Sequence, residues 1–152
     1  MGIEEMEIEI IATDNVADFK ELISLFAQVF EMENFVAPDT GHLSTLLQKE
    51  GFMAIAAKAD QKIIGGLTVY VIDRYYSANP LAYVYDLAVL NEYQRKGLGK
   101  RLMKFVTDYC REKGFEEVFV QAEKEDDHAV DFYRKTNPGR AEDVMHFTYT
   151  LK

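Results

Sequence analysis

The segment from Gln94 to Gly99, Gln-Arg-Lys-Gly-Leu-Gly, has the residue types and spacing best suited to chemistry in this chain. It follows an apolar, β-branched run that stops at Asn91 and precedes a long amphipathic pattern, which together predict a strand, a glycine loop and a helix. The first N–H groups of a helix have no partner within the helix, and the helix dipole favours an anion there. Because Gly97 and Gly99 lack a Cβ, the backbone can approach a ligand closely. The segment is therefore predicted to hold phosphate.

Three kinds of phosphate loop compete for this pattern. A P-loop requires Ser or Thr after its lysine, but Arg101 follows Lys100. A dinucleotide-binding loop requires a third glycine at position 102, which is Leu102. The pattern that fits is Q-x-x-G-x-G, and its structural alternative is an ordinary strand–loop–helix connection whose glycines only ease the turn.

Composition limits the class of protein. The 152 residues are 48% hydrophobic and 28% charged, which predicts one globular domain over residues 1–152. The net charge of −9 argues against a nucleic-acid partner and suits a cationic one. No apolar run is long enough to cross a membrane, and the acidic N-terminus is unlike a signal peptide, so we expect a cytoplasmic protein. The single cysteine, Cys110, is expected to be a buried hydrophobe on a helix.

Hydrophobic periodicity sets the elements that must position the loop. Alternating or continuous apolar runs predict strands over residues 6–12, 52–59, 62–73, 82–90, 116–122 and 144–151. Apolar residues recurring at three and four positions predict helices over residues 16–31, 42–50, 97–113 and 127–136. Asp60-Gln61 is expected to close a hairpin, Gly65-Gly66 to form a bulge or kink, and residues 74–81 to form a loop. This order is typical of a mixed α/β sheet.

The element order and the glycine loop resemble the GNAT superfamily of N-acetyltransferases over essentially the whole chain. Local motifs are similar to its aminoglycoside 3-N-acetyltransferase branch, namely Tyr85–Val89, Phe119–Ala122, Asp126-Asp127 with Ala129, Val130 and Tyr133, and Glu142–Phe147. The resemblance implies a single-domain GNAT fold, with a mixed, mostly antiparallel sheet and flanking helices. It also implies cytosolic transfer of an acetyl group from acetyl-CoA to an amine, and it allows a homodimer.

The resemblance also implies which residues bind acetyl-CoA. Backbone groups of one strand end would hold the acetyl and pantetheine parts, the loop would hold the pyrophosphate, and the helix after the next strand would add polar contacts. These residues are Leu87, Ala88, Val89, Gln94, Arg95, Lys96, Gly97, Leu98, Gly99, Lys100, Asp126 and Tyr133. Two departures from the family pattern occur. Asp126 replaces the usual asparagine, and Asn137-Pro138 replaces the usual glycine that ends the helix.

Two residues are candidates for proton transfer. The resemblance makes Tyr133 the acid for the leaving thiolate, with a core tyrosine as the alternative. Asp86 lies on the strand beside the expected cofactor edge, where alternation places it on the same face as Val84 and Ala88. Its carboxylate could accept the amine proton directly or through water, or serve instead as a salt bridge or a substrate anchor.

The acidic residues near the expected substrate end fit a small polycationic amine. They are Asp86, Glu123, Asp126, Asp127, Glu142 and Asp143. A solvated acidic loop is the alternative, and Asp126 or Asp127 could simply cap a helix. The three histidines have no metal-ligand spacing, so no metal is expected. Polyamines or protein amino groups remain alternative substrates, and a coenzyme-binding sensor without catalysis remains an alternative function.

Overall fold

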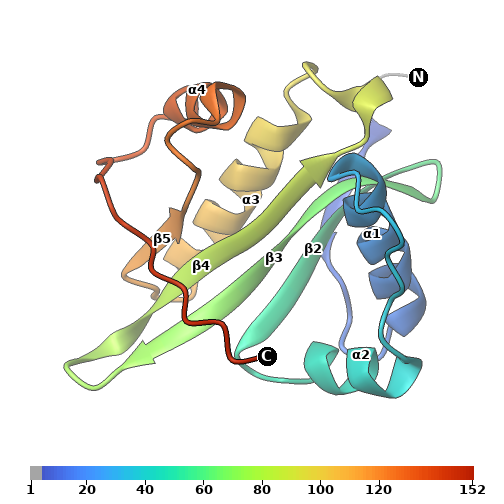
Figure 1. Cartoon of the computed structure of the whole chain (residues 1–152), viewed down its shortest axis with the longest axis horizontal. Coiled ribbons are helices and arrows are strands. Elements are labelled where there is room, and N and C mark those ends of the chain that lie inside the picture. Colours follow the sequence, from blue (N-terminus) through green and yellow to red (C-terminus); the bar gives the residue numbers. More distant parts are fainter. Residues whose placement is uncertain (1–4) are drawn as a thin grey trace. The chain divides into compact units, whose positions relative to one another are not determined.

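The computed structural model describes residues 5–152 (Figure 1). The chain divides into two units, Met1–Gln121 and Ala122–Lys152. The first unit contains one five-stranded sheet in the order β1-β2-β3-β4-β5. Its strands are β1 (Glu7–Ile10), β2 (Phe52–Ala59), β3 (Lys62–Arg74), β4 (Ser77–Val89) and β5 (Glu117–Val120). Its helices are α1 (Val16–Val29), α2 (Thr40–Leu47), the short 3-10 helix η2 (Asn91–Tyr93) and α3 (Leu98–Glu112).

The sheet is mixed and mostly antiparallel, as predicted. Each neighbouring pair from β1 to β4 is antiparallel, whereas β4 and β5 are parallel and joined through α3. Asp60 and Gln61 close the β2–β3 hairpin with φ angles of 50° and 65°. Two consecutive left-handed residues are what a tight hairpin turn requires. Figure 1 shows β3 and β4 as the longest strands, side by side along the sheet.

Helices cover both faces of this sheet, and Gly66 allows one of them to lie close. A Cβ at Gly66 would lie 2.5 Å from both the Ile55 carbonyl oxygen and Leu22 Cδ1 of α1. A Cβ at the neighbouring Gly65 would meet Leu98 Cδ2 of α3 at 3.3 Å. Successive strand residues point to opposite faces, so α1 and α3 pack on opposite sides of the sheet. The expected irregularity is confirmed, since the β2–β3 register shifts beside Gly65.

The apolar side of α3 is buried against the sheet. Leu102, Val106 and Cys110 are each no more than 1% exposed, and Leu98 is equally buried. Burial raises the pKa of the Cys110 thiol to about 11, so at neutral pH it stays protonated and unreactive. The expectation that Cys110 is a structural hydrophobe is confirmed.

The structure corrects two strand predictions. β4 begins at Ser77, within the expected loop, because Arg74 holds the start of this strand. The Arg74 guanidinium donates to the Asn79 carbonyl at 2.9 Å and pairs with Glu116 at 2.9 Å. Residues 144–151 are not a strand, because no strand in the described chain pairs with them. An alternating sequence indicates which side chains share a face, but a strand also needs a neighbouring strand to pair with.

The second unit contains α4 (Asp127–Arg134), close to the predicted helix. Asp126 caps it, its Oδ1 accepting from the Ala129 N–H at 3.1 Å. After the helix, Asn137 adopts a left-handed φ of 59°, the conformation that glycine more commonly provides at a helix end. No helix in residues 5–152 is long and apolar enough to cross a membrane.

Candidate functional site

The parallel pairing of β4 with β5 ends before β4 does. Their ladder runs from Leu81–Glu117 to Val84–Val120, where β5 stops, whereas β4 continues to Val89. The last part of β4 is therefore paired with β3 on one side and with no strand of the described chain on the other. A strand edge of this kind offers backbone donors and acceptors to a ligand.

The direction of these backbone groups follows from their hydrogen bonds. The N–H of Asp86 donates at 3.3 Å to a side chain of β3, and the N–H of Leu90 donates at 2.9 Å to the carbonyl of Ile64 in β3. Alternate residues of a strand direct their N–H groups to opposite sides. The N–H groups of Leu87 and Val89 therefore point away from β3, to the side where β5 has ended.

The glycine loop is fastened to the end of this strand by Gln94. Its side-chain amide donates to the Val89 carbonyl at 2.8 Å and to Asn91 Oδ1 at 3.1 Å. The loop then turns through two left-handed residues, Arg95 with a φ of 62° and Gly97 with a φ of 83°. A left-handed conformation costs a non-glycine residue about 1–2 kcal/mol, so the strained Arg95 fits a loop shaped for a ligand.

The first turn of α3 concentrates positive charge at a helix N-terminus. Gly97 caps the helix without a side chain, and no acidic residue occupies the first turn. The amides of Leu98, Gly99 and Lys100 have no acceptor within the helix. The basic Lys100 opposes the helix dipole in this position, which is unfavourable until an anion is present. This end of α3 is therefore suited to bind phosphate groups.

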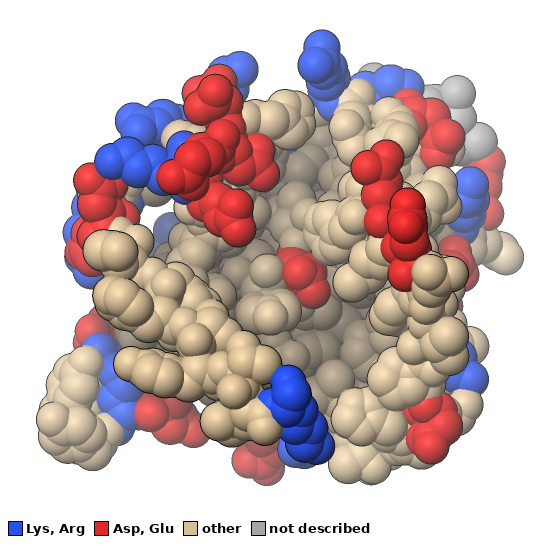
Figure 2. Space-filling model, viewed as in Figure 1, with Lys and Arg blue, Asp and Glu red and all other residues tan. Residues whose placement is uncertain are grey.

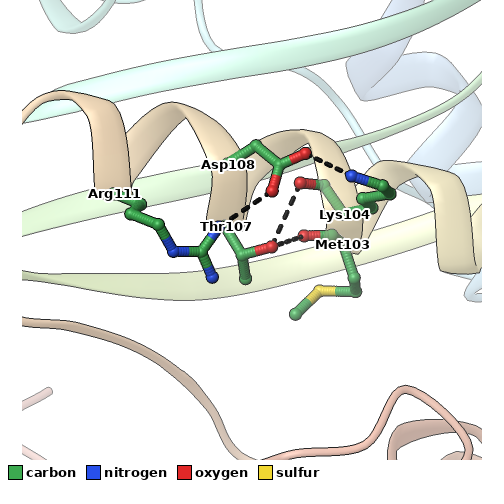
Figure 3. Close-up of polar contacts among 5 residues, drawn as sticks. All are labelled: Met103, Lys104, Thr107, Asp108 and Arg111. Atoms are coloured by element: carbon green, nitrogen blue, oxygen red, sulfur yellow. Dashed lines mark hydrogen bonds and ion pairs between the residues drawn. The ribbon is translucent and has the colours of Figure 1, made fainter.

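Farther along α3, acidic charge is neutralised within the helix (Figure 3). Asp108 accepts from Lys104 and pairs with Arg111 at 3.0 Å. The hydrogen bond from Lys104 is the main reason that the pKa of Asp108 is lowered. The Thr107 hydroxyl donates to the Met103 carbonyl at 2.9 Å, a part-buried contact on the same helix. The charge of the Asp108 carboxylate is therefore balanced by Lys104 and Arg111 on the same helix.

A β-bulge determines where Asp86 lies. Leu67 pairs with Leu87 but Val69 pairs with Val84, so two residues of β4 oppose one residue of β3. The bulge interrupts alternation, and the prediction that Asp86 shares a face with Val84 is wrong. Val84 is fully buried in the core.

Tyrosines surround the Asp86 carboxylate on the opposite face. The charge of Asp86 acts on Tyr70 and Tyr83, which are a cross-strand pair, and helps to raise the pKa of both behind the larger effect of burial. Tyr85 packs edge-on against Tyr70 at 5.5 Å and against Tyr83 at 5.7 Å. Over these central strands, Figure 2 shows mostly uncharged side chains, with acidic atoms visible among them.

Burial raises the pKa of the Asp86 carboxyl above its ordinary value. Removal from water disfavours the charged form, and no compensating ion pair of Asp86 is seen within residues 5–152. A carboxylate with a raised pKa is a better proton acceptor, and perturbed carboxyls of this kind are typical of catalytic sites.

Part of this site was not predicted from the sequence. The Tyr83 ring stacks on Phe119 at 4.7 Å, and its hydroxyl donates to Gln121 at 3.1 Å. Tyr70 and Thr68 were missed. Only the register of the β3–β4 hairpin identifies them, because it places Tyr70 opposite Tyr83 and Thr68 opposite the bulge.

The remaining predicted site residues belong to the second unit. Two of the acidic residues form ion pairs: Asp143 with Lys124 at 3.3 Å, and Glu142 with Arg140 at 2.7 Å. Asp126 is engaged as the cap of α4, Asp127 lies exposed in its first turn, and Glu123 is exposed just before it. Tyr133 lies on α4, with its ring against Phe132 at 4.9 Å. Within residues 5–152, no three His, Cys, Asp or Glu side chains are grouped to hold a metal ion.

Comparison with known proteins agrees with this geometry. The model of the acetyltransferase (GNAT) family matches residues 18–137. An aminoglycoside acetyltransferase from an uncultured soil metagenomic sample, solved in complex with trehalose, is 52% identical, with a TM-score of 0.95 and 97% of each chain covered. A structure with sisomicin is 51% identical over the same shares, also with a TM-score of 0.95. A second soil metagenomic aminoglycoside acetyltransferase is 28% identical, covering 97% of this chain and 99% of its own, with a TM-score of 0.89. A search of curated proteins found no match.

Replacing Asp86 by asparagine should stabilise the fold at neutral pH. The folded pKa of Asp86 is raised, so folding favours its protonated form and the ionised form weakens the fold as pH rises through that pKa. Asparagine resembles the protonated form. Chemical unfolding should therefore show a gain for Asp86→Asn at pH 7 that shrinks on acidification and vanishes below the ordinary pKa of 3.8.

The exposed Asp14 provides the control, since Asp14→Asn removes one charge from water, whereas Asp86 is half-buried. A loss of stability at pH 7 in Asp86→Asn, or a gain of the same size in both variants, would contradict the burial of this carboxylate.

Proposed function

The chain belongs to the acetyltransferase (GNAT) family, and on that premise we propose that it transfers the acetyl group of acetyl-CoA directly to an amine of an aminoglycoside. The observation that carries this proposal is the pair of outward N–H groups on Leu87 and Val89, next to the basic glycine loop. The soil metagenomic aminoglycoside acetyltransferase solved with trehalose and with sisomicin supports the substrate class, since its two structures match this chain at 52% and 51% identity over nearly its whole length.

The residues present fit acetyl-CoA along its length. The outward amides of Leu87 and Val89 would hold the acetyl carbonyl and the pantetheine amides, as strand edges bind extended chains. The loop from Gln94 to Lys100 would hold the pyrophosphate with its backbone amides and its basic side chains. When bound, acetyl-CoA supplies an acyl group on a good leaving group, so the chain needs no acyl-enzyme nucleophile.

The remaining chemistry is the movement of protons. Transfer forms a bond from the amine nitrogen to the acetyl carbon and breaks the carbon–sulfur bond, so the amine loses a proton and the sulfur gains one. We assign the first proton to Asp86, whose raised pKa makes it a stronger base than an exposed carboxylate. We assign the second to Tyr133, because its place on α4 matches the tyrosine of the family pattern.

The substrate would be held by charge. We propose Asp86 in the first unit and the acidic residues near α4 in the second unit as candidate binding groups for ammonium nitrogens. Of the latter, Glu142 and Asp143 have basic partners and Asp126 caps its helix, which makes Glu123 and Asp127 the stronger candidates for binding cations. Polyamines carry similar charge, so they remain the second class of substrate to test.

The first prediction concerns the loop and uses two matched glycines. Gly97 and Gly114 have φ angles of 83° and 84°, and neither has an atom within 4 Å of a Cβ added there. Valine at either position should therefore destabilise the fold by a similar amount, about 1–2 kcal/mol. Gly97→Val should also weaken acetyl-CoA binding at least tenfold by calorimetry, because the side chain occupies the phosphate side of the loop.

Gly114→Val should bind acetyl-CoA like the parent protein, because Gly114 lies beyond the other end of α3. Equal affinities for the two folded variants would show that this loop does not hold the pyrophosphate.

The second prediction concerns Tyr133. Tyr133→Phe keeps the ring that packs on Phe132 and removes the hydroxyl. Turnover in a thiol-release assay should fall by about 10- to 1000-fold, the range for one lost acid or oxyanion donor, while acetyl-CoA affinity changes little. The exposed Tyr149 provides a control, since Tyr149→Phe should retain full turnover. Full turnover in Tyr133→Phe would make Tyr133 a packing residue.

The third prediction tests the function itself. Thiol release from acetyl-CoA should be fastest with sisomicin-type aminoglycosides in a panel that includes polyamines, peptides and singly charged amines. The KM for the aminoglycoside should rise with added salt, because exposed charge pairs are screened beyond about 8–10 Å at physiological ionic strength. The KM for acetyl-CoA should change less, because backbone amides provide part of its binding.

Faster turnover of singly charged amines than of every aminoglycoside and polyamine would overturn the polycationic substrate. Acetyl-CoA binding without acetylation of any amine would instead favour a sensor module.

A further inference from the structure

Thr68 occupies an unusual place opposite the bulge. The β3–β4 ladder pairs the residues on either side of Thr68 with Leu87 and Val84, leaving Thr68 to face both Tyr85 and Asp86. A bulge of this kind leaves its extra residue without a ladder partner. The backbone N–H of the extra residue then needs a hydrogen-bond acceptor other than a carbonyl of the neighbouring strand.

The Thr68 side chain supplies that partner. Its Oγ1 accepts from the Asp86 N–H at 3.3 Å. Thr68 is 5% exposed and is the one polar residue among residues 5–152 that is buried. A buried hydroxyl costs free energy unless it is hydrogen-bonded, so a valine here would fill the same space without that cost. Packing alone does not account for a threonine at this position.

We propose that Thr68 is a positioning residue for the acetyl-transfer reaction, acting through the bulge that it anchors. By holding the amide of Asp86, its hydroxyl fixes the two residues at which β4 leaves regular alternation. Two consequences follow. The Asp86 carboxylate is directed to the face of Tyr70, Tyr83 and Tyr85, and the N–H groups of Leu87 and Val89 are directed to the open side of β4. The inference rests on the proposed function, because Asp86 is the proton acceptor only if the amine is acetylated.

Two substitutions of Thr68 separate a packing role from a positioning role. In Thr68→Val the shape is retained and the acceptor is lost, which leaves the Asp86 amide buried without a partner. In Thr68→Ser the acceptor is retained and one methyl group is lost. A residue that only packs would tolerate valine better than serine, whereas a residue that positions Asp86 would show the opposite order.

The experiment compares these variants in acetyl-CoA thiol release with sisomicin. Thr68→Val should lower kcat at least tenfold, a part of the 10²–10⁴-fold that a general base contributes. The KM for acetyl-CoA should rise as well, and the acid limb of the pH–rate profile should move to lower pH, toward an ordinary aspartate. That shift follows because the carboxylate is no longer held among Tyr70, Tyr83 and Tyr85, the titratable groups around it. Thr68→Ser should keep the parent pH profile and most of kcat.

A second measurement does not depend on activity. The amide proton of Asp86 should exchange slowly with solvent in the parent protein and in Thr68→Ser, and faster in Thr68→Val, as measured by nuclear magnetic resonance. If Thr68→Val does not fold, Thr68→Ala replaces it, and the comparison of alanine with serine decides the same question.

Two results would each overturn a different part of the proposal. A parent-like kcat and pH profile in Thr68→Val, with only stability changed, would overturn the positioning role and leave the proposed function intact. An unchanged pH profile and kcat in Asp86→Asn would overturn Asp86 as the proton acceptor, and the role of Thr68 with it.

Discussion

The candidate site depends on one departure from regular pairing, the β-bulge at Tyr85-Asp86. A regular β4 would continue the alternation of Tyr83 and Val84 and would send Asp86 into the core with Val84. The extra residue instead places the carboxylate on the tyrosine face. The bulge lies where the β4–β5 ladder stops, so the strand that carries Asp86 also has a backbone edge without a strand neighbour in the described chain. The proposed proton acceptor and the proposed binding edge therefore lie next to each other on β4, the first placed by the bulge and the second left open where β5 ends.

Two unfavourable charge arrangements occur in the candidate site, and each is of a kind that a bound ligand would relieve. Lys100 in the first turn of α3 opposes the helix dipole, with no acidic residue in that turn to offset it. The Asp86 carboxylate is withdrawn from water, which raises its pKa. In the proposed complex, pyrophosphate would relieve the first arrangement and an ammonium group would relieve the second. Asp108 on α3 differs from both, because Lys104 and Arg111 on the same helix balance its charge.

Sequence patterns predicted the helices, the order of the first five strands and the glycine loop, because each depends on local periodicity or on a backbone conformation that glycine allows. The loop was predictable from Gly97, whose left-handed φ is the reason for the glycine. The face of Asp86 was not, since a bulge depends on which residue of β3 lies opposite. Tyr70 and Thr68 were missed for the same reason. Residues 144–151 show the converse case, in which a strand-like pattern finds no strand partner in the described chain.

The central claim is that the amides of Leu87 and Val89 form the binding edge for the coenzyme. It is tested most directly by amide hydrogen exchange at single-residue resolution, with and without coenzyme A. The amides of Leu87 and Val89 should exchange readily in the free protein and become protected when coenzyme A binds. The amides of Asp86 and Leu90 already donate to β3 and should change little. Protection of Asp86 and Leu90 alone, or no change at Leu87 and Val89 under saturating coenzyme A, would contradict it.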